Sequence, residues 1–484
     1  MVNAVFRLLA TVALTVGAVA VAHANELRWN DSTSAAIDKN IAQLMEQTQT
    51  PGVAVAVIHN GKLLKESYYG LASVEYGVPV SEDTVFWLAS VSKQFTAALI
   101  LVLEQQGKLA LDDSIRKYLP ELPESWGAIK VRHLLTQTSG LNGYEDDRDA
   151  CVICNPDLGK PLQISDYLMQ AAKLKPDFAP GDEFHYGDTN PELLAIIASR
   201  ASGKPFPQLM HDALFQPAGM SGAYIYDYAR VMPNQITGYA VSHGILRRDF
   251  NRDSFLQLDH KNFGGAGNIF ATLTDVIHWN AALNSDRLLS SKNREQMWTA
   301  VRLNSGETAP YGFNFEIHNY PGGKVIGHNG IAGTEIWKLP EQKLDIIVLS
   351  NRGMSYSWAY VTTIADTLGL LDGLTPERMA EELGAALSPD RNIPMDGHYI
   401  WRWADMLDMD LRLWEDDGSL KGSFAGVPVE PYALDDGRIM LYSKMFWFPR
   451  RNSFPSTLEI KPDGVTLGWS EGDSVPMHRV ATAD

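Results

Sequence analysis

The chain has 484 residues, of which 45% are hydrophobic and 20% are charged, an ordinary composition for a globular protein of two or more domains. Its formal net charge of -17 argues against nucleic acid and anionic membranes as partners.

The first 24 residues have the pattern of a secretory signal sequence. Arg7 is the only charged residue among them, residues 8–20 are apolar, and Ala-His-Ala at 22–24 fits a small-x-small cleavage site. Since the apolar run is short for a membrane span, we expect cleavage rather than anchoring, and no span in the mature chain. The sequence therefore predicts an exported protein, either periplasmic or secreted.

From residue 25 onward, helical and strand patterns alternate. Helical spacing over 34–49 precedes a β-branched run over 53–58, and the pair Asn60-Gly61 separates that run from strand-like residues 63–69. Asn-Gly between two such runs is a strong hairpin signal. A helix is predicted from Ser90 to near Gly107. These elements predict an antiparallel sheet with helices packed on it.

The middle of the chain, from 108 to about 310, is rich in helix and loop patterns and contains a flexible glycine loop at 264–268. Strand patterns return over 313–317, 324–326, 334–339 and 344–349, and helical patterns follow over 356–370 and 375–387. The fold class is therefore α/β (α+β): an antiparallel sheet flanked by helices, with a mostly helical insert and a cleft at their junction.

The last hundred residues change character. A linker composition at 388–394 is followed by strict alternation of apolar and charged residues at 408–413, and by several Asp-Gly pairs typical of hairpin turns. This pattern predicts a small antiparallel, barrel-like β domain. The predicted division is a signal sequence over 1–24, a main domain over 25–388 and a C-terminal β domain over 389–484.

Cys151 and Cys154 are the two cysteines of the chain. In an exported protein, the favoured interpretation is a local disulfide that closes a loop. Free thiols or a metal site are alternatives, although two thiolates without neighbouring histidines make a poor zinc site. We predict no metal and no cofactor.

Ser90 and Lys93 form a Ser-x-x-Lys segment at the start of a predicted helix. Positions i and i+3 share one face, so the hydroxyl lies beside the amine. A serine hydroxyl needs a base, and a lysine can act as one if desolvation and the positive end of the helix dipole lower its pKa. Free N–H groups at the helix start can also hold negative charge on the adduct. The alternative is a serine N-cap followed by a solvated lysine.

Three segments occur in the order Ser90-Val91-Ser92-Lys93, Tyr186-Gly187-Asp188 and His328-Asn329-Gly330. They resemble the motifs S-x-x-K, Y-x-N and K/H-x-G of the serine β-lactamase and penicillin-recognising superfamily, on its class C β-lactamase and D-aminopeptidase side. The resemblance covers roughly residues 30–370. It implies a β-lactamase-like fold and a serine hydrolase that works through an acyl-enzyme.

The resemblance also implies a role for each motif residue. Ser90 would be acylated, Lys93 would help to deprotonate it, and Tyr186 would carry the proton to the leaving group. A phenol has a pKa near 10, so Tyr186 needs nearby positive charge, from Lys93 and from His328. The backbone N–H groups of Ser90 and Ile331 would form the oxyanion hole.

Asp188 departs from the family pattern, which usually has asparagine there. A carboxylate beside Lys93 would hold the lysine charged and raise its pKa, which would make Lys93 a worse base. Tyr186 would then have to accept the serine proton. Asn190, two residues later, is the alternative source of the missing amide. Asp188, Asn190, Asn329 and Gly330 are the expected substrate contacts.

His328 stands where β-lactamases mostly carry lysine, and we expect it on an edge strand facing Ser90. Near neutral pH a histidine offers a substrate carboxylate at most a partial charge, so efficient β-lactam hydrolysis is not expected. Esterases and D-amino-acid amidases of the family often show the histidine form.

The sequence thus predicts a serine hydrolase acting on a small amide or peptide, with a D-residue favoured. The alternatives are, in order, a carboxylesterase, a D-alanyl carboxypeptidase or weak β-lactamase, and a sensor module that is acylated but not deacylated. A small molecule or peptide is the expected partner, and the oligomeric state stays open. The tail resembles the β-barrel domains of D-aminopeptidases, which implies that it reaches into the cleft and restricts substrate size.

Overall fold

The structure is a computed structural model, and it describes residues 27, 29–141, 163–227, 230–242, 244–248, 264–320, 322–353, 357–389, 393, 397–403, 407–447, 455–461, 464–469 and 474–479. The predicted signal sequence and the predicted Cys151–Cys154 disulfide lie outside these residues. Within them, no helix combines the length and the apolar character that crossing a membrane requires.

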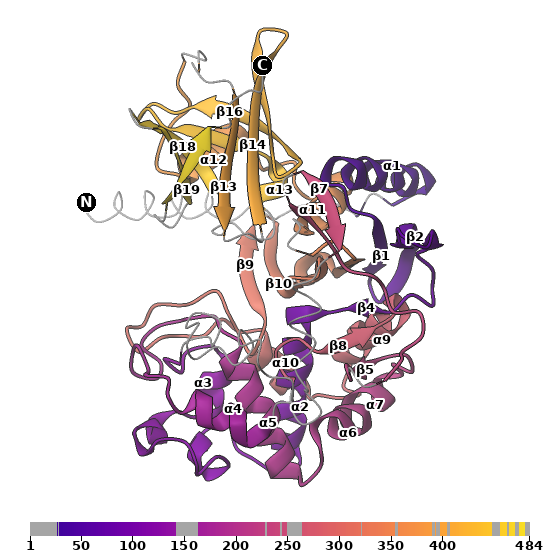
Figure 1. Ribbon diagram of the computed structural model, residues 1–484, viewed down its shortest axis with the longest axis vertical. Helices are drawn as coiled ribbons and strands as arrows, with labels where there is room; N and C mark the ends of the chain where they lie inside the picture. The colour runs from indigo at the N-terminus through magenta and orange to yellow at the C-terminus, as the bar shows by residue number, and fades with distance from the viewer. Residues whose placement is uncertain are drawn as a thin grey trace, which may run out of the picture.

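A seven-stranded antiparallel sheet forms the middle layer of the molecule (Figure 1). The turn between its first two long strands is Asn60-Gly61, with φ angles of 51° and 72° that suit a tight hairpin, so the predicted hairpin is confirmed. In sheet order the strands are β3 (Val78–Pro79), β2 (Lys62–Ser73), β1 (Gly52–His59), β12 (Leu344–Ser350), β11 (Thr334–Leu339), β10 (Gly323–Gly330) and β9 (Glu316–Tyr320).

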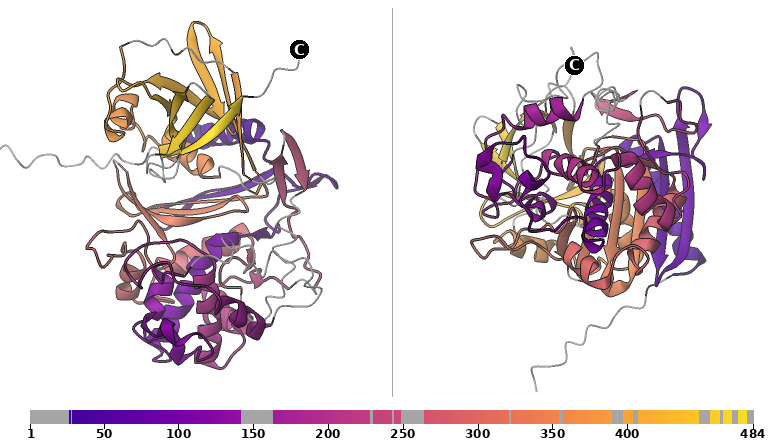
Figure 2. Two further views of the ribbon diagram at one scale, coloured as in Figure 1. Left: turned by 60° about the vertical axis from the view of Figure 1, so that its left-hand side comes forward. Right: turned by 90° about the horizontal axis from the view of Figure 1, so that it is seen from below.

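Both faces of this sheet are buried, because helices cover each of them (Figure 2). Along β1 the even-numbered residues 54–58 pack into the core of the helical subdomain, and the odd-numbered residues 53–57 pack into a second core on the opposite face. The second face is covered by α1 (Asp31–Thr48) and α11 (Trp358–Thr367), and α12 (Pro376–Glu382) lies beyond them.

The helical subdomain covers the first face and contains the segment predicted as a helix from Ser90. That segment is a 3-10 turn, η1 (Ala89–Val91), followed directly by α2 (Ser92–Gln105). The other helices here are α3 (Val131–Leu135), α4 (Ile164–Ala171), α5 (Thr189–Ser202), α6 (Phe206–Met210), the π-helix η4 (His211–Phe215), α7 (Gln216–Ala218), α9 (Leu273–Leu283) and α10 (Ser291–Met297). Short strands join the layers: β4 (Phe86–Trp87), β8 (Ile269–Ala271), β5 (Tyr224–Ile225), and the hairpin of β6 (Tyr239–Ser242) with β7 (Ile245–Arg248).

The tail forms a closed eight-stranded barrel, which agrees with the expected barrel-like fold. Its strands are β13 (Gly397–Trp403), β14 (Leu407–Asp416), β15 (Ser419–Phe424), β16 (Val427–Ala433), β17 (Ile439–Tyr442), β18 (Pro455–Lys461), β19 (Gly464–Trp469) and β20 (Ser474–Arg479), with the short helix α13 (Lys444–Trp447). All of them fall within the predicted range 389–484, and the domain boundaries themselves stay a prediction.

The barrel packs on α1, α11 and α12, and its apolar interior forms one continuous core with that helical layer. In Figures 1 and 2 the central sheet separates the barrel from α2 and the helical subdomain. The expectation that the tail reaches into the catalytic cleft is therefore not met by the described strands.

Candidate active site

Ser90 lies in η1, at the point where β4 turns into α2. The preceding residue, Ala89, is buried and has a φ of 46°, in the left-handed region that non-glycine residues rarely adopt. Such backbone strain costs of the order of 1–3 kcal/mol and is concentrated at functional sites. The turn is anchored to β8, because the Leu88 N–H donates to the Ile269 carbonyl oxygen at 2.9 Å.

Lys93 is fully buried one turn after Ser90 and makes three polar contacts. Its Nζ donates to Ser90 Oγ at 2.9 Å and to the Ala266 carbonyl oxygen at 3.0 Å. The third contact is an ion pair with Asp188 Oδ1 at 2.6 Å. The structure thus brings together the first and second motifs, with the hydroxyl beside the amine as the i, i+3 spacing predicts.

The charge state of Lys93 follows from these contacts. Burial by itself lowers the pKa of Lys93, but the negative charge of Asp188 and contact with Tyr186 more than offset this, so the pKa is raised overall. Lys93 is therefore an ammonium group at neutral pH that donates to Ser90 Oγ. It stabilises negative charge on that oxygen and is not poised to accept its proton.

Tyr186 lies beside the same pair. Lys93 Nζ lies 5.0 Å from the centroid of its ring. Lys93 and Ser90 are also close enough to act on the pKa of its hydroxyl. Enclosure of the hydroxyl raises the pKa of Tyr186, and the charge of Lys93 lowers it only in part. The residue is thus a neutral phenol, although 39% of its surface is exposed at the mouth of the site.

His328 lies on β10, which is not an edge strand, contrary to the expectation. The neighbouring strand β9 pairs only with residues 323–327, so His328 and the two residues after it extend past its end toward η1. The ring is buried, and its centroid lies 5.9 Å from that of Tyr186. The third motif therefore reaches the site where the ring of His328 lies next to the ring of Tyr186.

Both ring nitrogens of His328 have protein partners. Nδ1 lies 2.6 Å from the Asn329 carbonyl oxygen, which can only accept, so Nδ1 carries the hydrogen in the neutral ring. Nε2 then accepts from the hydroxyl of Tyr311 at 3.0 Å. Tyr311 is buried, and burial raises its pKa well above the usual value, so it remains a donor. Sequence analysis missed Tyr311.

The turn after β10 packs against the residues that precede Ser90. A Cβ atom on Gly330 would lie 2.4 Å from the Leu88 carbonyl oxygen, so only glycine fits there. The same oxygen accepts from Thr334 Oγ1 at 2.9 Å. This close approach places the backbone of Ile331 next to η1, where an oxyanion hole is predicted. Strand alternation directs the Asn329 side chain to the face opposite His328.

Asn190 does not point at Lys93. It is buried on α5, where its Nδ2 donates to Gln137 Oε1 at 2.5 Å and its Oδ1 accepts from Ser139 Oγ at 2.6 Å. Gln137 in turn donates to the Gly187 carbonyl oxygen at 3.0 Å. Asn190 and Gln137 thus support the backbone between Tyr186 and Asp188. Gln137 was not among the predicted residues.

Glu192 is a second residue that sequence analysis missed. Its carboxylate accepts from the backbone N–H groups of Gly264, Gly265 and Ala266 at 2.8, 3.0 and 3.0 Å. The expectation of a flexible glycine loop is therefore wrong, because this loop is buried and held so that the Ala266 carbonyl oxygen meets Lys93. Burial raises the pKa of Glu192 to about 7 in spite of these donors. The sequence did hold a signal for Glu192, because it follows Asp188 by four residues and so lies on the same helix face.

Comparison with known proteins identifies the family of the chain. The family model described as Beta-lactamase matches residues 37–359. Penicillin-binding protein 4* of Bacillus subtilis is 30% identical over 326 residues, covering 64% of this chain and 70% of that protein. A D-aminopeptidase of Gluconobacter oxydans is 26% identical over 368 residues, covering 73% of this chain and just under two thirds (65%) of the relative.

Solved structures share the fold at low sequence identity. The octameric penicillin-binding protein homologue from Pyrococcus abyssi superposes with a TM-score of 0.62 at 21% identity, covering 92% of this chain and 100% of that one. EstCE1, described as a hydrolase with promiscuous acyltransferase activity, gives a TM-score of 0.60 at 20% identity over 70% of this chain and 98% of its own. With the matched family model covering more than half of its residues, the chain belongs to the Beta-lactamase family.

Proposed function

We propose that this protein is an exported serine hydrolase that forms an acyl-enzyme on Ser90 and cleaves a small amide or peptide, with a D-residue on the acyl side. The observation that carries the proposal is the hydrogen bond of 2.9 Å from Lys93 Nζ to Ser90 Oγ, with the ring of Tyr186 centred 5.0 Å from the same amine. The D-residue is supported by the relatives that are named D-aminopeptidase.

The proton path follows from the charge states of the site. Ser90 Oγ attacks the carbonyl carbon and passes its proton to the Tyr186 oxygen, while Tyr186 gives its own proton to the leaving nitrogen. This exchange needs no phenolate, which suits a tyrosine whose pKa is raised. The ammonium of Lys93 stabilises the charge that develops on both oxygens. Water then attacks the acyl ester by the reverse route, which frees the acid and restores Ser90.

The backbone N–H groups of Ser90 and Ile331 are the proposed donors to the oxyanion. The close packing of Gly330 on Leu88 supports this assignment, because it brings the two segments together. Donors of this kind are commonly worth about 10²–10³ in rate each.

His328 bears on the choice of substrate. Its two nitrogens are engaged by Asn329 and Tyr311, so the ring has no free N–H for a substrate carboxylate. The carboxylate of Glu316, 3.9 Å from Nδ1, would pair with any positive charge on the ring. The charges of Lys93 and Asp188 pair with each other. These contacts favour substrates without a carboxylate next to the scissile bond over penicillins and cephalosporins.

A panel of substrates tests the proposal. D- and L-aminoacyl p-nitroanilides, short p-nitrophenyl esters and a chromogenic cephalosporin would be assayed with the wild type and with Ser90→Ala. We expect turnover of D-aminoacyl anilides that is lost in Ser90→Ala and retained in Ser81→Ala, an exposed serine outside the site. Activity that survives Ser90→Ala, or hydrolysis of the cephalosporin alone, would overturn the proposal.

A carboxylesterase is the second candidate. It is supported by the open mouth of the site, where Tyr186 and Ile331 present 39% and 52% of their surfaces, and by the structural neighbour EstCE1. Turnover of p-nitrophenyl esters without any turnover of anilides would favour it. A fluorophosphonate or penicillin adduct that persists by mass spectrometry, with no turnover of any substrate, would favour a sensor.

A further inference from the structure

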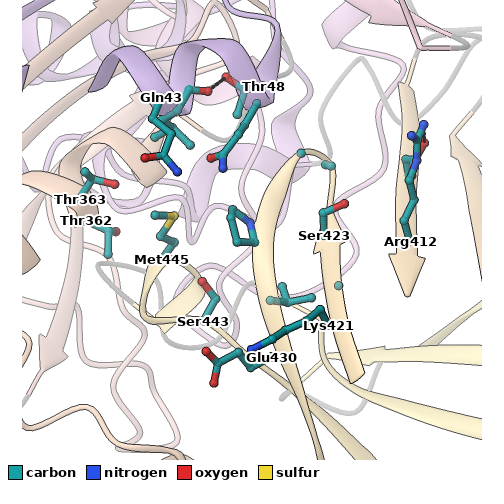
Figure 3. Close-up of a pocket in the computed structure, with 18 of the residues that line it drawn as sticks. Gln43, Thr48, Thr362, Thr363, Arg412, Lys421, Ser423, Glu430, Ser443 and Met445 are labelled. Carbon is teal, nitrogen blue, oxygen red and sulfur yellow. Dashed lines mark hydrogen bonds and ion pairs between the residues drawn. The ribbon is translucent and has the colours of Figure 1, made fainter. Parts of the chain in front are cut away.

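A cavity of about 1040 Å³ lies between the helical layer and the barrel, and Figure 3 shows part of its lining. Helices α1 and α11 form one wall, and strands β14, β15 and β16 form the other. The volume is at the upper end of the range for small-molecule sites, which are often found between domains. The central sheet separates these elements from η1 and α2, so the cavity is distinct from the site around Ser90.

The charges of the lining residues balance. Four are acidic and four are basic, although the whole chain carries a formal charge of -17. These residues are Asp366, Asp410, Asp416, Glu430, Arg352, Arg412, Lys421 and Lys444. Two pairs neutralise each other directly, Lys444 with Asp366 at 2.7 Å and Arg412 with Asp410 at 3.1 Å. A balanced lining gives no preference for a phosphate, a nucleotide or a cation, and so favours an uncharged ligand.

Amides and hydroxyls supply the remaining polar groups. Gln43 and Gln47 lie one helical turn apart on the exposed side of α1. Ser423 and Ser443 line the barrel side of the same cavity (Figure 3). Thr363 is more than nine-tenths buried, and its hydroxyl has no hydrogen-bond partner among the residues that the structure describes. Groups that both donate and accept match a ligand that is itself rich in hydroxyls.

Trp414 adds an aromatic surface to the same lining. It lies on β14 with 45% of its surface exposed, so its ring is accessible to a ligand in the cavity. An indole ring beside amides and hydroxyls suits a molecule with one apolar C–H face and a polar edge. Addition of a peptide strand to the barrel is disfavoured, because β13 pairs with β20 and the described strands form a closed barrel.

We propose that this cavity binds an uncharged saccharide, with Trp414 stacked on one sugar ring and Gln43, Gln47 and Ser443 bonded to its hydroxyls. Binding there does not depend on Ser90 chemistry, so the proposal stands independently of the proposed function. It also assigns a role to the interface between the barrel and the α1/α11 layer.

Calorimetry and tryptophan fluorescence with maltotriose, cellotriose and triacetylchitotriose test the proposal on the full-length protein. At least one of them should bind, and Trp414→Ala and Gln43→Ala should each weaken binding about tenfold or more. Glu46→Ala, an exposed neighbour on α1 outside the cavity, and Ser90→Ala should leave the affinity unchanged. An unchanged unfolding midpoint would establish that each variant is folded.

Three results would overturn the proposal. One is the absence of binding by all three trisaccharides at about 10 mM, a concentration that would nearly saturate a site with a Kd of about 1 mM. Another is equal affinity in the wild type and in both cavity variants, which would place the saccharide elsewhere. The third is that a neutral tripeptide binds in the cavity and the trisaccharides do not. Hydrolase activity need not be measured, so failure here is distinct from failure of the proposed function.

Discussion

Asp188 Oδ1 lies 2.6 Å from Lys93 Nζ, so the lysine of the first motif is one half of an internal ion pair. The partner stands where the sequence family usually has asparagine, which cannot carry this charge. Asp188 thereby keeps Lys93 protonated, and in the proposed mechanism proton transfer falls to Tyr186. This ion pair favours the role of a fixed positive charge for Lys93 over the role of a base.

Asp188→Asn should move the alkaline limb of the pH–rate profile to lower pH. Burial alone lowers the pKa of Lys93 and Asp188 opposes this, so removing the carboxylate lets the pKa fall. If the ammonium is the active form, activity is lost as the pH rises through the pKa of Lys93. The variant should therefore lose activity at a pH about one unit or more below that of the wild type. The measurement is kcat/KM against pH, with the exposed Asp177→Asn as control. An activity that increases as Lys93 loses its proton would instead make the lysine the base.

Tyr311→Phe should change substrate preference more than overall rate. The substitution removes the hydroxyl that donates to His328 Nε2. This nitrogen can then be protonated, and its N–H can donate a hydrogen bond to a substrate carboxylate. We expect the kcat/KM ratio of carboxylate-bearing to neutral substrates to rise, most strongly below pH 7. Tyr360→Phe is the matched control, since it removes a buried hydroxyl that bonds Thr48 on the far side of the sheet. An equal loss on both substrate classes would indicate a purely structural role.

Glu192→Gln should alter both activity and the pH dependence of stability. In the folded protein, burial raises the pKa of Glu192 from 4.5 to about 7, so the folded state binds more protons between these values. The free energy of unfolding therefore falls as the pH rises from about 4.5 to about 7, by up to about 3 kcal/mol from this residue. The variant should lack this contribution when urea unfolding is compared across the interval.

The same variant should also be less active. A glutamine has one acceptor oxygen, so it cannot receive all three N–H groups of the glycine loop, and the Ala266 carbonyl oxygen would move away from Lys93. Glu183→Gln, on an exposed residue, is the control. If Glu192→Gln retained both the wild-type rate and the wild-type pH dependence of unfolding, the carboxylate would have neither role.

Removal of residues 389–484 should destabilise the catalytic part. The barrel interior and the layer of α1, α11 and α12 share one continuous apolar core, so truncation exposes apolar side chains of that layer. We expect a lower melting temperature and aggregation of the truncated chain, measured by calorimetry and size-exclusion chromatography. A truncated protein that is monodisperse, equally stable and altered only in substrate range would instead support a gating role for the tail.

Much of the fold was predictable from local patterns. Asn60-Gly61 marked the hairpin between β1 and β2, and Thr334–Leu339 was predicted as a strand with the same bounds as β11. The strand predicted over 313–317 is found at Glu316–Tyr320, because the preceding residues are buried loop whose apolar character resembles a strand. The glycine loop at 264–268 was wrongly predicted as flexible, because composition does not reveal that the Glu192 carboxylate accepts from its N–H groups.

By itself, the sequence determined the order of the three motifs, the i, i+3 placement of Lys93 beside Ser90 and the barrel-like tail, because these follow from spacing and periodicity along the chain. The tertiary structure decided that Glu192 holds the glycine loop and that Tyr311 donates to Nε2 of His328. It also decided that the barrel lies on the side of the central sheet opposite the helical subdomain. Each of these is a contact between elements that are far apart in sequence. Whether a buried polar group finds its partner depends on packing, which no local pattern contains.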